Sequence, residues 1–148
     1  MTNNSDVINR IIVNYEQDED PLPINFNIED YVAKIIHHLQ LNIDYIEITL
    51  LTSTSIQKLN RQYFKADIAT DTISFNLTPE ECITGDLYLC PATIRRNADE
   101  FNMSYLNEFQ LVLIHSVLHL MGKDDEKEAD YVDMKKTQER ILEELSHA

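Results

Sequence analysis

Two histidines and an aspartate are spaced as metal ligands would be near the end of a helix. His115 and His119 are four residues apart in the most apolar segment, so on a helix both imidazoles leave the same face about one turn apart. Gly122 and Asp125 follow at three-residue steps, and a helix-ending glycine lets the chain turn back toward one ion. Asp124 is an alternative third ligand. Two imidazoles, one carboxylate and an open position are typical of a catalytic zinc site, because structural sites normally use four protein ligands.

The donor types restrict the metal and the reaction. Zn²⁺ is the first choice, and Fe²⁺ or another divalent metal also suits two histidines and a carboxylate. Zinc proteases of similar spacing have a glutamate base directly after the first histidine, where this chain has Ser116, which cannot accept a proton near neutral pH. Peptide hydrolysis is therefore disfavoured, and the chemistry needs either a metal-activated water alone or an acidic group from elsewhere. The competing interpretation is that the two histidines only make hydrogen bonds within a core helix.

The elements that must position these residues alternate between strands and helices. Residues 7–15, 43–52, 72–77 and 86–90 are rich in β-branched and aromatic side chains and are predicted as strands. Helices are predicted from apolar periodicity over residues 28–39, 53–63, 91–101, 104–122 and 128–145. Asn27, Ser104 and either Ser53 or Thr54 are expected to cap three of them, and Gly122 to end the most apolar one. We therefore expect an α+β fold with an approximately four-stranded mixed sheet, about five flanking helices, and the metal site on a central buried helix.

The composition bounds the size, the location and the partners. A chain of 148 residues suits one domain over residues 1–148. It has only two glycines, which excludes the Walker A loop and the dinucleotide-binding fingerprint. The formal net charge of -14 opposes whole-molecule attraction to DNA, RNA or anionic membranes, so any RNA contact needs a local patch. No secretion signal or membrane span is visible, so we expect a cytoplasmic protein.

The residues around the histidines match a known signature. His115 to Asp125 reads HSVLHLMGKDD, which resembles the H-G-x-L-H-L-x-G-x-D-H signature of the YbeY family of metal-dependent endoribonucleases. Serine replaces the first glycine, and Asp125 replaces the third ligand histidine. Upstream, Leu59-Asn60-x-x-Tyr63 and Asp67-x-x-Thr70-Asp71-x-x-Ser74-Phe75 follow the family pattern L-N-x-x-Y-R-x-x-D-x-x-T-D-V-L-S-F, with Phe64 in place of the arginine. Gly85-Asp86-Leu87 looks like the family's G-D-I strand start.

The resemblance implies an α+β fold with a sheet flanked by helices and a metal in a cleft. It implies a single-strand-specific endoribonuclease with bound zinc that acts in ribosomal RNA maturation and quality control, notably at the 3′ end of the small-subunit RNA. The partners would be single-stranded and ribosomal RNA and the ribosome or its proteins, and neither DNA nor a membrane is expected. Several residues, mostly in the matching motifs, are expected to support the site: Thr70, Asp71, Ser74, Gly85, Asp86, Gly122 and Asp124.

The basic residues that could meet RNA lie mostly in one stretch. Residues 58–96 hold equal numbers of basic and acidic side chains, whereas the rest of the chain is strongly acidic. We therefore expect a neutral-to-basic cleft wall that contains Lys58, Arg61 and Lys65, with Lys123 at its edge and Arg95 and Arg96 in the same stretch. The competing interpretation is a set of scattered, solvated charges.

Two other functions stay open at the level of sequence. One is a zincin-like hydrolase of another substrate such as a peptide, against which Ser116 argues. The other is a non-enzymatic ribosome-assembly factor whose metal is structural, and the acidic composition and the altered ligand Asp125 keep this alternative open.

Overall fold

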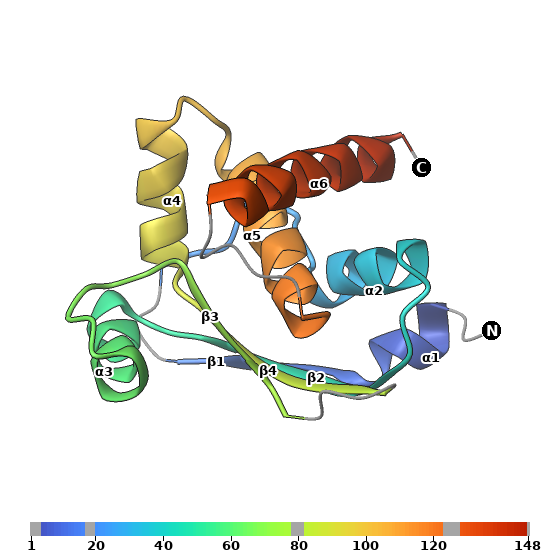
Figure 1. Ribbon diagram of the computed structural model, residues 1–148, viewed down its shortest axis with the longest axis horizontal. Coiled ribbons are helices and arrows are strands. Elements are labelled where there is room, and N and C mark those ends of the chain that lie inside the picture. Colours follow the sequence, from blue (N-terminus) through green and yellow to red (C-terminus); the bar gives the residue numbers. More distant parts are fainter. Residues whose placement is uncertain (1–3, 17–19, 78–81, 123–127, 148) are drawn as a thin grey trace.

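The computed structural model describes residues 4–16, 20–77, 82–122 and 128–147. Over these residues the chain forms six helices and four strands (Figure 1), in the order α1 (Asn4–Ile8), β1 (Ile11–Tyr15), α2 (Ile28–His38), β2 (Ile43–Leu50), α3 (Ser53–Phe64), β3 (Thr72–Asn76), β4 (Ile83–Leu89), α4 (Pro91–Glu100), α5 (Tyr105–Leu120) and α6 (Glu128–Ser146). The expected α+β fold is confirmed. Within the same ranges, no helix is long and apolar enough to cross a lipid bilayer.

The strands form one mixed sheet in the order β1-β2-β4-β3. Strands β1, β2 and β4 are parallel, and β3 runs antiparallel to β4 at one edge. Helices α2 and α5 pack on one face of the sheet, and α6 lies across α5 on the side away from the sheet (Figure 1). Helix α5 is therefore central, as its apolar sequence predicts, and Phe109, Leu113 and Val117 on it are completely buried.

The N-terminal segment differs from the prediction. The sequence predicts one strand over residues 7–15, but Val7 lies in α1 and β1 begins only at Ile11. Val7 is 2% exposed, and α1 packs against α2. In the turn that follows, the Arg10 amide donates to the Val7 carbonyl (2.9 Å). The prediction is wrong for residues 7–10, because burial against α2 overrides the strand propensity of β-branched residues.

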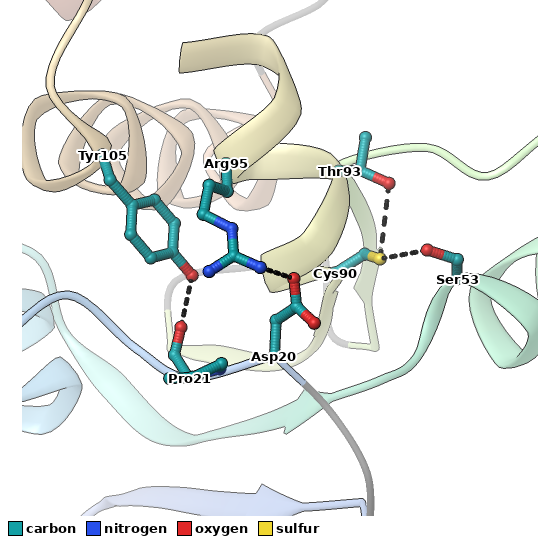
Figure 2. A network of polar contacts seen from close by, with 7 residues as sticks. All are labelled: Asp20, Pro21, Ser53, Cys90, Thr93, Arg95 and Tyr105. Atoms are coloured by element: carbon teal, nitrogen blue, oxygen red, sulfur yellow. Dashed lines mark hydrogen bonds and ion pairs between the residues drawn. The ribbon is translucent and has the colours of Figure 1, made fainter. Parts of the chain in front are cut away.

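Helices α4 and α5 fix the segment that leads into α2 (Figure 2). Arg95 on α4 forms an ion pair with Asp20, and its guanidinium carbon lies 5.9 Å from the ring centre of Tyr105. The Tyr105 hydroxyl donates to the Pro21 carbonyl (2.8 Å). Arg95, which lies in the same stretch of sequence as the expected basic wall, is therefore engaged in an ion pair with Asp20.

Cys90 is buried where α3 and α4 begin, and it is a packing residue as expected. The Thr93 hydroxyl donates to the Cys90 sulfur (3.3 Å), and the Ser53 hydroxyl oxygen lies 3.7 Å from the same atom (Figure 2). Cys82 is exposed. These contacts help to close a small second core around Ile56, which seats α3 beside β3.

Candidate metal centre and cleft

His115 and His119 face each other on α5, as their four-residue spacing predicts. Their Nε2 atoms are 2.9 Å apart, and their rings meet edge to face with centroids 4.5 Å apart. Both side chains are partly exposed, although most of α5 is buried. Two imidazoles on a tetrahedral zinc have ligand nitrogens about 3.3 Å apart, given zinc–nitrogen bonds of about 2.0–2.1 Å. A small rotation of the rings would let both Nε2 atoms bind one ion, so the pair fits a divalent metal.

Gln138 on α6 holds the other edge of the His115 ring. Its Oε1 atom lies 2.9 Å from His115 Nδ1. An amide oxygen only accepts hydrogen bonds, so Nδ1 carries the proton and the Nε2 lone pair points toward His119. Metal-binding histidines are commonly oriented by such a bond from their second nitrogen. No motif links Gln138 to a histidine 23 residues earlier, so sequence reasoning missed it.

Ser116 faces β3 and anchors α5 to this edge strand. It is fully buried, its hydroxyl donates to the Val112 carbonyl (2.8 Å), and its oxygen lies 2.8 Å from the Thr72 hydroxyl. Since Val112 uses the single Ser116 proton, Thr72 donates to Ser116. The Asn76 side-chain amide also donates to the Leu120 carbonyl (2.7 Å). Ser116 therefore positions the helix and does not act as a base beside the histidines.

Two glycines shape the C-terminal end of α5, which carries His119. Gly85 on β4 packs against this end, and Gly122 follows it in the chain. A Cβ atom at Gly85 would lie 2.8 Å from both Leu120 Cδ atoms, so β4 has no room for a side chain where it meets the last turn of α5. Gly122 has a φ of +89°, the left-handed conformation expected of a residue that ends the helix. Gly85 thus lets the histidine-bearing turn sit directly on the sheet.

Two adjoining cavities open beside the histidines and share His115 and Asp71. The β3 cavity, of about 420 Å³, is lined by Asn60, Phe64, Thr70, Asp71, Thr72, Ile73, Ser74, His115 and His119. The α6 cavity, of about 370 Å³, is lined by residues that include Glu108, Tyr131, Lys135 and Gln138. Both volumes fall in the range of ligand sites, about 300–1,000 Å³. Three residues expected to support the site, Thr70, Asp71 and Ser74, therefore meet the histidine pair in one cavity.

Asp71 and Glu108 are acidic groups that flank His115 from outside the histidine motif. Burial raises the pKa of Asp71, while the charge of His115, the Thr72 amide and the Thr70 hydroxyl oppose part of that rise. Burial, and then the charge of Asp71, raise the pKa of Glu108. Carboxyl groups with raised pKa values keep their protons to higher pH, which suits general acid–base chemistry. The motifs indicate Asp71 only as a supporting residue, and they carry no signal for Glu108.

Other predicted site residues lie away from the histidine pair. Asp86 follows Gly85 on β4, so its side chain is on the sheet face away from α5, in register with Glu47 of β2. Burial and the charge of Glu47 raise the pKa of Asp86. The three cations expected in the cleft wall, Lys58, Arg61 and Lys65, are exposed on α3 and at its C-terminal end.

These cations do not enter the site itself. Arg61 lies 3.5 Å from Asp67 in an exposed ion pair, and neither cavity lining, over the described residues, includes any of the three. The remaining predicted residues, Lys123, Asp124 and Asp125, lie outside the described residues. Within the part of the chain that the structure describes, no three His, Cys, Asp or Glu side chains are placed to hold a metal ion together.

Comparison with known proteins identifies the family. The sequence profile of the family Endoribonuclease YbeY matches residues 12–146. An Endoribonuclease YbeY from Persephonella marina is 31% identical over 144 residues, which cover 93% of this chain and 94% of that protein. Another, from Chloroherpeton thalassium, is 42% identical over 92 residues, which cover 62% of this chain and 65% of that protein. The solution structure of TM1509 from Thermotoga maritima has a TM-score of 0.64 and 29% identity, and covers 90% of this chain and 87% of that chain. The chain belongs to the YbeY endoribonuclease family.

Proposed function

We propose that this protein is a metal-dependent endoribonuclease that cleaves single-stranded RNA at the histidine pair of α5. The observation that carries the proposal is the convergence of His115 and His119, with Nε2 atoms 2.9 Å apart, on the β3 cavity of a chain in an endoribonuclease family. The substrate indicated by the resemblance is ribosomal RNA, notably the 3′ end of the small-subunit RNA. The setting is ribosome maturation and quality control in the cytoplasm.

Zn²⁺ is the metal that we assign to this pair, with Asp125 as the third ligand and Asp124 as its alternative. Fe²⁺ would suit two imidazoles and a carboxylate as well. A metal so held would polarise a phosphoryl oxygen or make a water molecule more acidic. Gln138 keeps the proton of His115 on Nδ1, which leaves Nε2 unprotonated for the metal.

The carboxyl groups beside His115 supply the acid and base that the motif lacks. Asp71 lines both cavities, and Glu108 lines the α6 cavity. Their pKa values are raised by burial, so these carboxyls suit the transfer of a proton from the attacking oxygen and to the leaving oxygen. Ser116, at the position of the protease base, is instead buried against β3, which argues against peptide hydrolysis.

The charge of the protein favours RNA in the context of the ribosome over free RNA. A net charge of -14 repels a polyanion, so binding to naked RNA should be weak. Lys58, Arg61 and Lys65 lie on or just beyond the helix that also contributes Asn60 and Phe64 to the β3 cavity. We assign phosphate contacts to these three cations and to Lys123. Ribosomal RNA or a ribosomal protein would supply the remaining attraction.

Metal content and RNA cleavage test the proposal together. Elemental analysis should find one bound divalent metal per chain, and a single-stranded small-subunit 3′-end RNA should be cleaved only when the metal is present. His119→Ala should lose the metal and slow cleavage roughly 100-fold or more, since a metal contributes several kcal/mol of transition-state stabilisation. His37→Ala, at an exposed histidine on α2, should change neither property.

The outcomes separate the alternatives. Unchanged cleavage by His119→Ala overturns the proposal, because the cleavage then does not depend on the histidine pair. Full metal loading with no metal-dependent cleavage favours the non-enzymatic assembly factor.

A further inference from the structure

Phe64 is an aromatic residue at the β3 cavity that the proposed chemistry does not use. It is the last residue of α3, where Lys65 ends the helix in the left-handed conformation, with a φ of +56°. Phe64 is 54% exposed, yet it lines the same cavity as His115 and His119. Single exposed apolar side chains are common on protein surfaces, so the distinguishing feature of Phe64 is its place in the histidine cavity.

The ring of Phe64 contacts one other aromatic ring, that of Phe75. It stacks on Phe75 of β3, with ring centroids 6.0 Å apart and an angle of 19° between the planes. Phe75 in turn meets Tyr63 (5.3 Å) and Tyr88 (6.0 Å) edge to face. Phe75 also packs in the small core beside α3. Phe64 therefore presents an aromatic surface that its stack on Phe75 helps to orient before a ligand binds.

Ser74 indicates that the same cavity receives polar groups. Its hydroxyl oxygen is buried and has no hydrogen-bond partner among the described residues, and Ser74 lines the β3 cavity. A buried hydroxyl without a partner is unfavourable unless a ligand or a water molecule satisfies it. The cavity thus combines a histidine pair, an unsatisfied hydroxyl and an aromatic surface. A nucleotide offers a phosphodiester, sugar hydroxyls and a flat base to these three groups.

We infer that Phe64 stacks on one unpaired nucleobase of an RNA strand whose phosphodiester lies at the histidine pair. The inference rests on the proposed function and states how the same site selects single strands. Bases in a duplex are stacked on their neighbours, whereas the bases of a single strand can splay out and stack on an aromatic ring. Stacking also needs no positive charge on the protein, which suits a chain with a net charge of -14.

A binding cycle between protein and RNA tests the stacking directly. A short fluorescein-labelled single-stranded RNA is titrated with metal-free protein at low salt, and one abasic position is moved along the strand. With the wild type, one abasic position should weaken binding about 5- to 150-fold, the range for loss of a base–aromatic stack. Phe64→Leu should weaken binding to the intact RNA by a similar factor, and that abasic position should then have little further effect.

Matched variants make the test decisive. Phe64→Trp should retain or strengthen binding. Tyr15→Leu removes an aromatic residue that is 55% exposed on β1, at the opposite edge of the sheet, and should change nothing. Thermal unfolding checks the fold of each variant, and Phe64→Trp with the abasic series keeps the test valid if Phe64→Leu unfolds. Independent effects of Phe64→Leu and the abasic position, or no RNA binding by the wild type, overturn the inference.

The cycle also distinguishes this inference from the proposed function, because it measures binding without metal and without cleavage. Suppose that Phe64→Leu and the abasic position weaken RNA binding non-additively in a protein that shows no metal-dependent cleavage. That result supports the stacking and rejects the nuclease reaction. Metal-dependent cleavage by a protein whose Phe64→Leu variant binds RNA as tightly as the wild type supports the nuclease reaction and rejects the stacking.

Discussion

Replacing Gln138 by leucine tests whether its hydrogen bond prepares His115 for a metal. Leucine has a high helix propensity, so α6 should be retained while the acceptor 2.9 Å from His115 Nδ1 is lost. The His115 ring can then place its proton on Nε2, the atom that lies 2.9 Å from His119 Nε2. A protonated Nε2 cannot bind a metal, so metal binding must first displace that proton.

The expected loss of metal affinity follows from the strength of the hydrogen bond between Gln138 and His115. A neutral hydrogen bond contributes about 0.5–1.5 kcal/mol net, and loss of a hydrogen bond to a metal ligand lowers metal affinity about 10- to 100-fold. His115 and Gln138 are both partly exposed, so water replaces part of the lost interaction. We therefore expect the lower end, an increase of about 10-fold in Kd, which corresponds to about 1.4 kcal/mol.

Competition with a chromophoric chelator measures the Kd for Zn²⁺. Gln138→Glu keeps an acceptor and should bind Zn²⁺ at least as tightly as the wild type, and Glu143→Gln is a control at an exposed position of α6. Nitrogen NMR of the metal-free protein should show a shift of His115 toward the Nε2-protonated form in Gln138→Leu alone. An unchanged Kd and an unchanged tautomer in a folded Gln138→Leu variant would refute the reasoning.

Three further predictions concern stability and RNA binding. Gly85→Ala places a methyl group 2.8 Å from the Leu120 Cδ atoms, so urea unfolding should show a loss of roughly 1–3 kcal/mol that shrinks in a Leu120→Ala background; a fully additive double variant would contradict the contact. Glu16 accepts the Thr52 amide (2.8 Å) and the Ser55 hydroxyl (2.6 Å), with the Ser55 bond the larger cause of its lowered pKa. Because the pKa of Glu16 is lower in the folded than in the unfolded protein, its charged form stabilises the fold above the unfolded pKa of about 4.3. This contribution is lost as the pH falls through the folded pKa. Glu16→Gln should therefore cost about 1 kcal/mol at neutral pH and progressively less below about pH 4; a cost independent of pH would reject the charged hydrogen bonds. Charge reversal at Lys58, Arg61 and Lys65 should weaken RNA binding and flatten its dependence on salt; unchanged binding would reject phosphate contacts by these cations.

Helix ends were predictable because their physics involves only neighbouring residues. The Asn27 side chain accepts from the Asp30 amide (2.8 Å), and the Ser104 hydroxyl accepts from the Asn107 amide (3.0 Å), so these two expected caps are confirmed. The cap expected at Ser53 or Thr54 is wrong, because α3 begins one residue earlier and Thr52 caps it. The positive φ of Gly122 is equally local. The spacing of the two histidines placed them on one helix face for the same reason, since it depends only on helix geometry.

The misses come from contacts between segments that are distant in the sequence. Gln138 and His115 are 23 residues apart on two helices, and Thr72 and Ser116 are 44 residues apart. Local patterns do not encode either pair. The sequence predicts a strand that begins at Asp86. In the structure β4 begins at Ile83, because pairing with β2 extends it. Tertiary packing likewise overrides local propensity in residues 7–10.

The central claim is that His115 and His119 hold a divalent metal together with Asp125. Anomalous diffraction at the zinc edge, from crystals of the Zn²⁺-loaded protein, tests it most directly. We predict one peak about 2.0–2.1 Å from Nε2 of both histidines and about 2.0–2.2 Å from a carboxylate oxygen of Asp125. A zinc peak away from the histidine pair, or an Asp125 carboxylate farther than about 2.5 Å from the ion, would contradict the claim.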